Sequence, residues 1–459
     1  MLEILRVELS LQPNQVKNVE EIYTFARNNF ISLSIVEHLH NTITDLDELK
    51  DVLEGIKVPS QFYYLRTNLN KISIKELIEE FNLEFPGANA LKGPLENTIK
   101  IPFSEKKMIP LLSKQIYTDK FAAESIMMGA DLFIPGFGGM SDKFEKGEIV
   151  SILLKKANLN NKTNGIPKKF HVANGETMIS SKDFPKFNKG ILVNTTLPKY
   201  SIPKYRSSII YNNGWISEQT LPATIACAIF VDEILKNTQI ENPVIFDTCS
   251  APGHKTTAIA ELSHLLYSLQ DMSKWLKIIS IDRSTNRLEH LRNDIKRLDL
   301  HNIEVLPIKL EKISTKIPEL LGKADFLLFD PPCSTLGTRP KLYLEKSQEI
   351  FMDYPRNQRR LLKIVDKLVK PGGILMFNTC TIPKEENEGI IAYAIQKLGY
   401  KTIPIDQKYL KFGKSGLDYD GLDINDLKNL LRFYPQYSEG SGYFIALLRK
   451  KENSLMMKL

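Results

Sequence analysis

The cysteines of this sequence point to nucleophilic chemistry. Cys333 lies in the segment DPPCS, directly after the apolar run ADFLLF, and Cys380 lies in TCT, directly after the apolar run GGILMFN. Two prolines after a buried strand end its hydrogen-bonded ladder and stiffen the loop that follows. A thiolate is a strong nucleophile, and a nearby Lys255 could lower the thiol pKa. We interpret Asp330, Cys333 and Cys380 as parts of one active site.

A second group of candidate residues follows an earlier strand. The run PVIFD ends at Asp247 and leads through TCSAPGHKT into a helix, which places backbone N–H groups at the carboxyl edge of a sheet. The loop is neither a Walker loop nor a GxGxxG loop, so phosphate binding is not expected. Asp282 ends the next strand and could accept hydrogen bonds from a ribose. Together they indicate an adenosine-type cofactor without a polyphosphate, with a structural turn and a helix-capping Asp as the alternative. The candidate cofactor residues are Cys249, Ser250, Ala251, Pro252, Gly253, His254, Lys255 and Asp282.

One adenosine-type cofactor without a polyphosphate is a sulfonium methyl donor, and two thiols beside such a donor suit one reaction in particular. Carbon 5 of a pyrimidine is not nucleophilic, but addition of a thiolate at carbon 6 creates enamine character at carbon 5. That carbon can then attack a methyl group, and a base must later remove its proton. An acid such as Asp330, in contact with the ring, would stabilise the adduct.

The elements that must hold these residues fall into three regions. Residues 1–105 mix helical and strand patterns, with helices expected over 47–53 and 74–81, the second capped by Ser73. Residues 114–205 read as short strands broken by Gly and Pro, with GFGG at 136–139 as a turn, which is typical of a small β-barrel. From about residue 212, apolar strands alternate with amphipathic helices, which predicts an α/β domain with a parallel sheet covered on both faces.

Composition and charge narrow the class of protein. The 459 residues carry a net charge of +7, and residues 105–212 hold 17 Lys and Arg against 9 Asp and Glu. A positive charge confined to one segment suggests a nucleic-acid partner, with a solvated lysine-rich face as the alternative. The four cysteines fit neither a disulfide framework nor paired zinc ligands, and we expect no metal. No apolar run is long enough for a membrane span and no secretion signal is visible, so we expect a soluble, cytoplasmic protein.

The motifs DTCSAPGHKT, SIDRS, ADFLLFDPPCSTLGTRP and GGILMFNTCTIPKEENE occur in this order over roughly 140 residues. The sequence thereby resembles the Sun-type (Fmu/NOL/NOP/Sun) family of RNA cytosine-5 methyltransferases. The resemblance implies a Rossmann-like methyltransferase domain that uses S-adenosyl-L-methionine. It also implies that Cys380 is the nucleophile and that Cys333 assists proton removal and product release. Asp330 and Lys255 would contact the target cytosine, Asp330 beside the cofactor as well, and Asp282 would contact the cofactor ribose. Residues 249–255 would wrap the methionine end of the cofactor.

Two positions depart from the family pattern. The family usually has an Asp after the third strand that touches adenine, and this sequence has Lys309 near that place, with Glu311 as a possible substitute. His254 stands where Gly or Asn is common, which we read as tolerated variation.

The resemblance extends upstream of the catalytic motifs. Arg66 and Asn68 match a recurrent RxN pattern of the family's N-terminal RNA-binding subdomain. The basic segment that opens with DKFAAESIMMGADLFIPGF resembles a PUA domain, and PUA domains bind structured RNA, often at the CCA end of tRNA. We expect an N-terminal α+β subdomain over 1–110, the PUA domain over 111–206 and the catalytic domain over 207–459. The predicted RNA contacts are Phe133, Lys168, Lys169 and Asn174, with ordinary barrel surface or core as the alternative.

The sequence therefore predicts an RNA cytosine-5 methyltransferase that forms 5-methylcytosine through a covalent Cys380 intermediate. Among Sun-type enzymes, an inserted PUA domain marks the branch that methylates cytosine 72 of the tRNA acceptor stem, so tRNA is the expected substrate. Ribosomal RNA is the alternative with the same chemistry, and a non-catalytic RNA-binding protein is the alternative from another class. DNA is less favoured, because cytosine-5 DNA methyltransferases take their nucleophile from the PC motif after the fourth strand. Nothing in the sequence suggests obligate assembly, so we expect a monomer.

Overall fold

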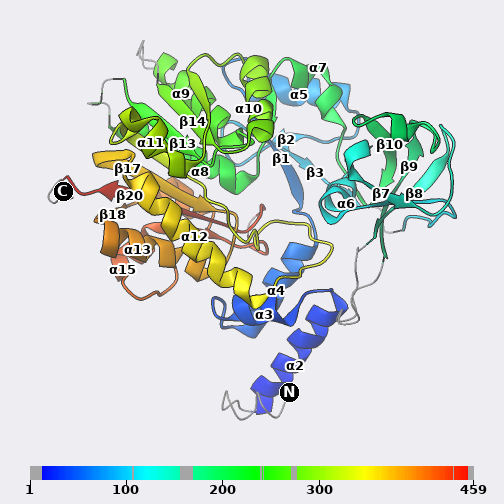
Figure 1. Cartoon of the computed structure of the whole chain (residues 1–459), viewed down its shortest axis with the longest axis horizontal. Coiled ribbons are helices and arrows are strands. Elements are labelled where there is room, and N and C mark those ends of the chain that lie inside the picture. Colours follow the sequence, from blue (N-terminus) through cyan, green and yellow to red (C-terminus); the bar gives the residue numbers. More distant parts are fainter. Residues whose placement is uncertain are drawn as a thin grey trace.

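The computed structural model describes residues 13–105, 108–155, 169–237, 240, 242–269, 276–437 and 439–452. Figure 1 shows three parts: N-terminal helices at the bottom, a small barrel at the right, and a large sheet flanked by helices at the left. The first part begins with three helices, α2 (Pro13–Asn28), α3 (Leu33–His40) and α4 (Leu46–Lys57).

A four-stranded sheet follows these helices, with the order β12-β1-β3-β2. Its helix α5 (Ile74–Glu84) begins as predicted at Ser73, whose side chain accepts from the Glu76 N–H in a capping box. One edge strand, β12, comes from beyond the barrel and pairs antiparallel with β1. The barrel is therefore inserted between strands of this sheet. The strands are β1 (Phe62–Thr67), β2 (Leu91–Lys92), β3 (Thr98–Pro102) and β12 (Ile216–Glu218).

The barrel is a six-stranded sheet with the order β6-β10-β9-β8-β5-β7, packed around its own apolar core. The predicted turn at 136–139 is wrong in part, because Phe137–Met140 forms strand β7 and pairs with β5. One glycine of this strand, Gly139, has a φ of 130°, a backbone conformation that favours glycine. The elements are β5 (Gln115–Thr118), α6 (Lys120–Ile126), β6 (Leu132–Phe133), β7, β8 (Ile149–Lys155), β9 (Lys169–Thr177) and β10 (Ile191–Pro198). A short pair, β4 (Ser104–Glu105) with β11 (Tyr200–Ser201), lies where the chain enters and leaves the barrel.

The large sheet has the order β15-β14-β13-β16-β17-β20-β18, with β19 paired to β20. The five strands predicted from the sequence are parallel to one another, as expected. The last strands differ from a purely parallel sheet, because β20 runs antiparallel to its three neighbours. The strands are β13 (Val244–Thr248), β14 (Lys277–Asp282), β15 (Ile303–Pro307), β16 (Ala324–Phe329), β17 (Val369–Thr379), β18 (Tyr400–Ile403), β19 (Leu430–Phe433) and β20 (Tyr443–Lys450).

Helices cover both faces of this sheet, as the apolar strands require. Alternate residues of one strand enter different cores: Phe326 and Leu328 of β16 pack with α8 and α9, whereas Leu327 and Phe329 pack with α12 and α13. The period of two along each strand thus divides its side chains between two apolar layers. The helices are α7 (Ile209–Asn212), α8 (Leu221–Lys236), α9 (His254–Leu269), α10 (Thr285–Leu298), α11 (Ile313–Lys316), α12 (Gln348–Asp366), α13 (Glu388–Leu398), α14 (Gln407–Leu410) and α15 (Ile424–Lys428).

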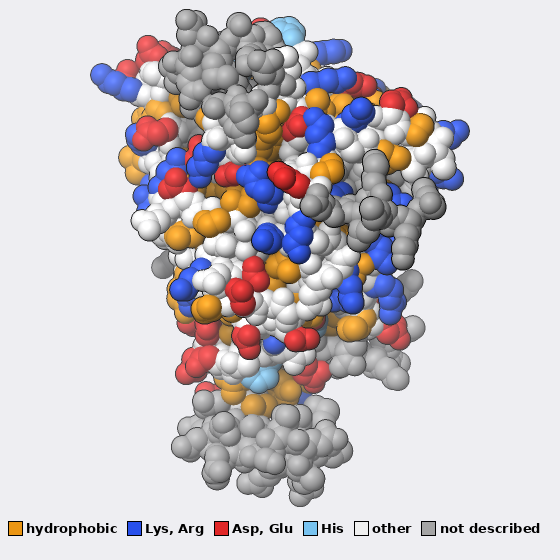
Figure 2. Space-filling model, turned by 90° about the vertical axis from the view of Figure 1, so that its left-hand side faces the viewer, with side chains coloured by type: hydrophobic (Ala, Val, Ile, Leu, Met, Phe, Trp, Pro, Cys, Tyr) orange, Lys and Arg blue, Asp and Glu red, His pale blue; other side chains and the backbone are white. Residues whose placement is uncertain are grey.

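The surface opposite the barrel mixes charges of both signs. Figure 2 shows blue and red side chains interspersed over the side that lies at the left of Figure 1. Within the described residues, no helix has the length and apolar character needed to cross a bilayer. The same residues contain no group of three or more His, Cys, Asp or Glu side chains placed to hold a metal ion.

Candidate active site

The two predicted active-site thiols lie side by side. The Sγ atoms of Cys333 and Cys380 are 3.5 Å apart. They belong to the loops that follow β16 and β17, which are parallel neighbours in the sheet, and the Gly337 N–H donates to the Cys380 carbonyl oxygen at 3.1 Å. The parallel register therefore brings the DPPCS and TCT segments together, as the sequence predicted.

The environment distinguishes the two sulfurs. A hydrogen bond from the Cys333 thiol lowers the pKa of Cys380, against the opposing effect of burial. The same bond, with burial, raises the pKa of Cys333 well above its ordinary value. Cys333 is buried, whereas Cys380 is partly exposed. Cys380 is thus the more acidic and the more accessible thiol, which suits a nucleophile.

Lys255 and Asp330 form an ion pair at the same edge of the sheet. Burial lowers the pKa of Lys255, but the attraction and hydrogen bond of Asp330, together with Tyr443 and Cys227, outweigh it and hold that pKa well above its ordinary value. Lys255 also contributes to lowering the pKa of Cys380, although less than the hydrogen bond from Cys333 does. The main cause of the thiol's acidity is therefore the neighbouring cysteine and not the lysine that the sequence indicated.

The loop between β13 and α9 has a backbone that few residues could adopt. Cys249 has a φ of 61° and Gly253 a φ of 110°. A Cβ on Gly253 would lie 2.6 Å from Leu291 Cδ1, so glycine is required there by contact as well as by conformation. The Ser250 hydroxyl accepts from the Ser280 hydroxyl at 2.6 Å, which ties the loop to β14.

Asp282 lies at the carboxyl end of β14, beside this loop. Its Oδ2 accepts the Ala251 N–H at 3.1 Å, and its Oδ1 accepts the Ser284 N–H at 2.8 Å. A carboxylate has about four lone-pair sites, so two remain for further donors such as ribose hydroxyls. The loop, Asp282 and the first turn of α9 thus fit an adenosine-type cofactor.

The third strand shows the departure that the sequence indicated. Lys309 follows β15 and is exposed. Glu311 accepts from Arg360 Nη1 of α12 at 2.7 Å. Burial is the main cause that raises the pKa of Cys249, and the charge of Glu311 adds to it after those of three aspartates. Glu311 is therefore close enough to the cofactor loop to act on it electrostatically.

Sequence reasoning gave no role to three polar residues that support the thiol loops. Glu386, Asn387 and Glu388 are fully buried directly after the Cys380 segment. The Asn387 side chain accepts from Thr379 Oγ1 at 2.6 Å and donates to the Thr381 carbonyl at 3.1 Å. The run of charged and polar residues KEENE, at positions 384–388, could have indicated these partners from the sequence. Acidic side chains next to an apolar strand are rarely buried without a bonding partner.

Each of the two glutamates has a different partner. Glu388 pairs with the buried Arg432 of β19, at 2.6 Å from Nη1 to Oε1. Glu386 Oε2 accepts the Ser334 N–H at 2.9 Å and a Gln358 amide N–H at 3.1 Å. The segment after the nucleophile is thereby bonded to β19, to α12 and to the Cys333 loop.

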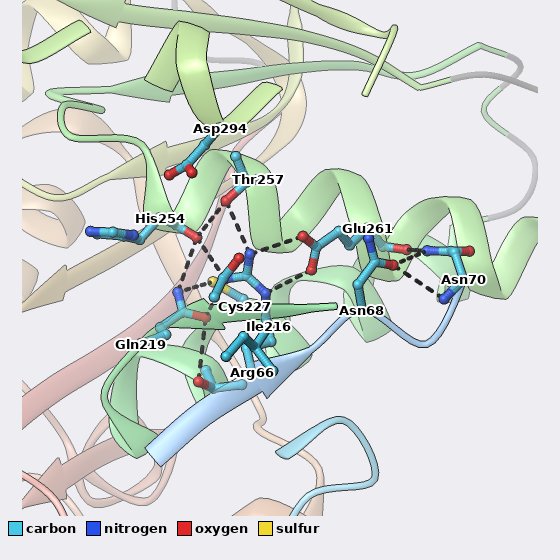
Figure 3. A network of polar contacts seen from close by, with 12 residues as sticks. Arg66, Asn68, Asn70, Ile216, Gln219, Cys227, His254, Thr257, Glu261 and Asp294 are labelled. Atoms are coloured by element: carbon cyan, nitrogen blue, oxygen red, sulfur yellow. Dashed lines mark hydrogen bonds and ion pairs between the residues drawn. The ribbon is translucent and has the colours of Figure 1, made fainter. Parts of the chain in front are cut away.

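A buried network joins the N-terminal sheet to the helix that carries Lys255 (Figure 3). Arg66 of β1 has no exposed surface and pairs with Glu261 of α9 at 2.8 Å. Its Nη1 also donates to the His254 carbonyl at 3.0 Å and to Gln219 Oε1 at 2.9 Å. Asn68 accepts from the Asn70 side chain, which in turn donates to the Glu261 carbonyl. The RxN pattern thus fixes the first turns of α9.

The predicted RNA contacts of the barrel differ from one another in placement. Phe133 is 51% exposed on β6, and Lys169 is exposed on β9 with its Nζ 2.8 Å from the Tyr117 hydroxyl. Asn174 lies inside the barrel, where it accepts from Ser151 Oγ and donates to the Pro110 carbonyl. The structure thus gives Asn174 a structural role and contradicts its prediction as a polar reader. Lys168 lies outside the described residues.

Comparison with known proteins bears on the whole chain. A family described as "16S rRNA methyltransferase RsmB/F" matches residues 234–449, and the PUA domain family matches residues 114–196. The tRNA (cytosine(72)-C(5))-methyltransferase of Pyrococcus horikoshii is 31% identical over 409 residues, which cover 88% of this chain and 93% of that protein. The chain belongs to the Sun-type family of S-adenosylmethionine-dependent RNA cytosine-5 methyltransferases.

Other members of this family match over similar lengths. The human protein named tRNA (cytosine(72)-C(5))-methyltransferase NSUN6 is 26% identical over 454 residues, covering 93% of this chain and 90% of that protein. A solved structure described as NSun6 from Pyrococcus horikoshii with SFG, an analogue of S-adenosylmethionine, superposes with a TM-score of 0.73 at 30% identity. It covers 92% of this chain and 99% of that chain. These matches confirm the predicted family, its Rossmann-like methyltransferase fold and the PUA domain.

Proposed function

We propose that this Sun-type enzyme methylates carbon 5 of cytosine 72 in the tRNA acceptor stem, with Cys380 as the nucleophile. The observation that carries the proposal is the pair of thiols 3.5 Å apart at the edge of the sheet, of which Cys380 is the more acidic. The choice of tRNA is supported by relatives in Pyrococcus horikoshii and human that carry this activity in their names and that match nearly the whole chain.

The mechanism assigns one role to each side chain of the site. S-adenosylmethionine, when bound, supplies an electrophilic methyl group. The Cys380 thiolate forms a bond to carbon 6 of cytosine, and the displaced electron pair makes carbon 5 nucleophilic. Lys255 and Asp330 orient the ring and stabilise the charge that develops on it. After methylation, Cys333 acts as the base: in its thiolate form it accepts the proton from carbon 5. The bond between Cys380 Sγ and carbon 6 then breaks, which restores the aromatic ring.

The acidity of the thiols sets the order of these steps. The hydrogen bond between the two sulfurs lowers the pKa of Cys380 and raises that of Cys333, so Cys380 is the thiol that ionises first. Once Cys380 is bonded to carbon 6, Cys333 must release its proton to solvent water before its thiolate can accept the carbon 5 proton. The reaction therefore depends on how the Cys333 loop is held.

The target cytosine must leave its stack to reach Cys380, at a cost of a few kcal/mol that is lowest near the end of a helix. We propose that the PUA barrel binds the single-stranded CCA tail, which adjoins the target cytosine. The distance between the barrel and the thiols would then determine which nucleotide reaches Cys380. Phe133 would serve as a stacking platform and Lys169 as a phosphate ligand. The basic charge of residues 105–212 supports this role. We further propose that the enzyme acts as a monomer, in the cytoplasm, with domain limits near residues 110 and 206.

Ribosomal RNA remains the second candidate substrate. One observation favours it: the family that matches the catalytic domain is described by its 16S rRNA methyltransferase members. That family match covers the catalytic domain alone, whereas the relative named as a tRNA methyltransferase matches the barrel as well.

Methyl transfer from labelled S-adenosylmethionine to total tRNA, followed by bisulfite mapping, tests the proposal. A parallel reaction uses tRNA without its CCA tail. We expect a mark at the acceptor-stem cytosine that is lost without CCA. A mark on ribosomal RNA alone would overturn the substrate, and no methylation of any RNA would overturn the proposed activity.

A further inference from the structure

Glu386 and Gln358 form a buried pair whose hydrogen bonds do not balance. Both side chains have no exposed surface, and they come from different elements, the turn after β17 and the middle of α12. Two of their oxygens, Glu386 Oε1 and Gln358 Oε1, are buried with no hydrogen-bond partner in the part of the chain that the structure describes. Buried polar atoms without a hydrogen-bond partner are rare and destabilising, so two of them in side chains that are bonded to each other need an explanation.

The partners of the other atoms fix the orientation of both groups. Gln358 Nε2 donates to the Pro332 carbonyl at 3.2 Å, and because a carbonyl only accepts, the amide nitrogen must face it. Glu386 Oε2 accepts from the Ser334 N–H and from Gln358 Nε2, so this oxygen cannot carry a proton directed at either donor. Among the described residues, the Gln358 amide oxygen is left as an acceptor without a donor, and Glu386 Oε1 also has no partner.

A single proton on Glu386 would satisfy both atoms. Protonated Glu386 is a donor as well as an acceptor, and a carboxylic acid and a primary amide pair through two parallel hydrogen bonds. One of those bonds, from Gln358 Nε2 to Glu386 Oε2, is present at 3.1 Å. The second needs the Oε1 proton and ends on the Gln358 amide oxygen.

The charges around Glu386 favour the neutral form. In the described part of the chain no cation forms an ion pair with it, in contrast to Glu388 and its partner Arg432. The groups that face it are Lys346, Tyr354 and the Cys333 thiol, and Lys346 Nζ donates to the Ser334 carbonyl, 2.6 Å away. Burial raises the pKa of Glu386, with the hydrogen bonds and Lys346 opposing.

We propose that Glu386 is a positioning residue that carries a proton at neutral pH, donates it from Oε1 to Gln358, and so fixes the Cys333 loop without adding a negative charge beside the thiols. The acid–amide pair bonds the Pro332 carbonyl on one side of Cys333 and the Ser334 N–H on the other. An ionised Glu386 would hold the same loop but would raise the pKa of Cys333 further and oppose the thiolate. The role in catalysis rests on the proposed function, whereas the protonation state does not.

The first test measures thiol reactivity without RNA. The rate at which iodoacetamide alkylates Cys380 is measured as a function of pH in the unmodified enzyme and in its Glu386→Gln variant. Glutamine is neutral, accepts from Ser334 and donates to Gln358, so we expect the same midpoint of alkylation within about 0.3 pH units. An ionised Glu386 predicts a fall of the midpoint by roughly one unit, because the substitution then removes a neighbouring charge. That fall would overturn the proposal.

A matched control compares two fully buried glutamates. Glu386→Gln should leave the melting temperature unchanged or raised, with the gain larger at pH 8 than at pH 5, since a group with a raised pKa loses its stabilising contribution as pH increases. Glu388→Gln should lower the melting temperature at both pH values, because Arg432 is left without its partner. Equal losses in both variants would contradict the proposal.

The positioning role is read from turnover. Glu386→Leu removes the acceptor of the Ser334 N–H, and we expect kcat to fall at least tenfold with the KM for RNA within threefold. Glu386→Gln should restore kcat to within threefold of the unmodified enzyme. If the Leu variant does not fold, the Gln variant and the alkylation profile still decide the question. If the enzyme methylated no RNA, the proposed function would be wrong, but the alkylation experiment would still test the protonation state of Glu386.

Discussion

The thiol edge of the large sheet and the outer surface of the barrel hold their polar groups in opposite ways. At the thiol edge, Glu386, Asn387 and Glu388 are fully buried and bonded to three different segments. On the barrel, Phe133 is 51% exposed, and the exposed Lys169 donates to two side chains of β5, Gln115 and Tyr117. Bond-making chemistry needs atoms fixed in place, whereas a surface that binds a flexible RNA end can remain open until the RNA arrives.

This difference predicts two kinds of mutational response. Substitutions at the thiol edge should change rate or folding steeply, because each removes a bond that nothing replaces. Each substitution on the barrel should weaken RNA binding only slightly, and the changes in binding free energy should be nearly additive when substitutions are combined. The predictions below test that contrast, from the largest expected effect to the smallest.

Removal of the nucleophile should have the largest effect. Cys380→Ala should reduce single-turnover methyl transfer by roughly 10⁴-fold or more, because the addition to carbon 6 is lost. The affinity for tRNA, measured by filter binding, should stay within about twofold. A variant with measurable turnover near that of the unmodified enzyme would show that the wrong thiol had been assigned.

The buried ion pair between the N-terminal sheet and α9 should come next. Arg66→Leu leaves Glu261 buried and unpaired, which should cost about 3–5 kcal/mol in the free energy of unfolding, measured by urea denaturation. The double variant Arg66→Leu/Glu261→Leu should recover most of that loss. If the double variant is as unstable as the single one, the charge is not the cause.

Asp247 gives a stability prediction with a pH dependence. Burial raises the pKa of Asp247 from its ordinary 3.8 to about 7. The folded state therefore favours the protonated acid, and its contribution to stability is complete below pH 4 and lost as pH rises through about 7. Asp247→Asn should stabilise the protein by roughly 1–4 kcal/mol at pH 8 and little at pH 4. The same gain at both pH values would refute this assignment.

The barrel should show the smallest single effects. Phe133→Ala should weaken tRNA binding by about 5- to 10-fold, the loss of one stacked base, with kcat unchanged. Lys169→Ala should weaken binding only slightly and reduce the salt dependence of log Kd by about one unit. Phe187→Ala provides a matched control, since this phenylalanine is also exposed, at 52%, outside the predicted contacts. Equal losses for both phenylalanines would mean that Phe133 has no special role.

The residues at the carboxyl edge of the sheet could be predicted from the sequence, because the position of each one depends only on the strand next to it in the chain. Asp282 ends an apolar strand, Asp330 and Cys380 each follow one, and parallel strands bring their ends to one edge. The antiparallel β20 was not predicted, because its apolar run resembles any buried strand and its direction depends on the chain between 380 and 443.

The supporting residues were harder to predict because their partners are distant. Gln358 meets Glu386 only because α12 packs over the turn after β17, and neither spacing nor residue type reveals that contact. The role of Asn174 was predicted wrongly for a related reason. Its position on β9 turns the side chain into the barrel, and a register that is set by neighbouring strands cannot be read from one strand alone.

The most direct test of the account is the fate of the covalent intermediate in three variants. Cys333→Ala, Cys380→Ala and the double variant are each incubated with tRNA and S-adenosylmethionine and separated on denaturing gels. We expect an RNA–protein adduct in Cys333→Ala alone, because Cys380 still adds to the ring but release is blocked. An adduct that persists in the double variant, or that appears in Cys380→Ala instead, would contradict the assignment of Cys380 as the nucleophile.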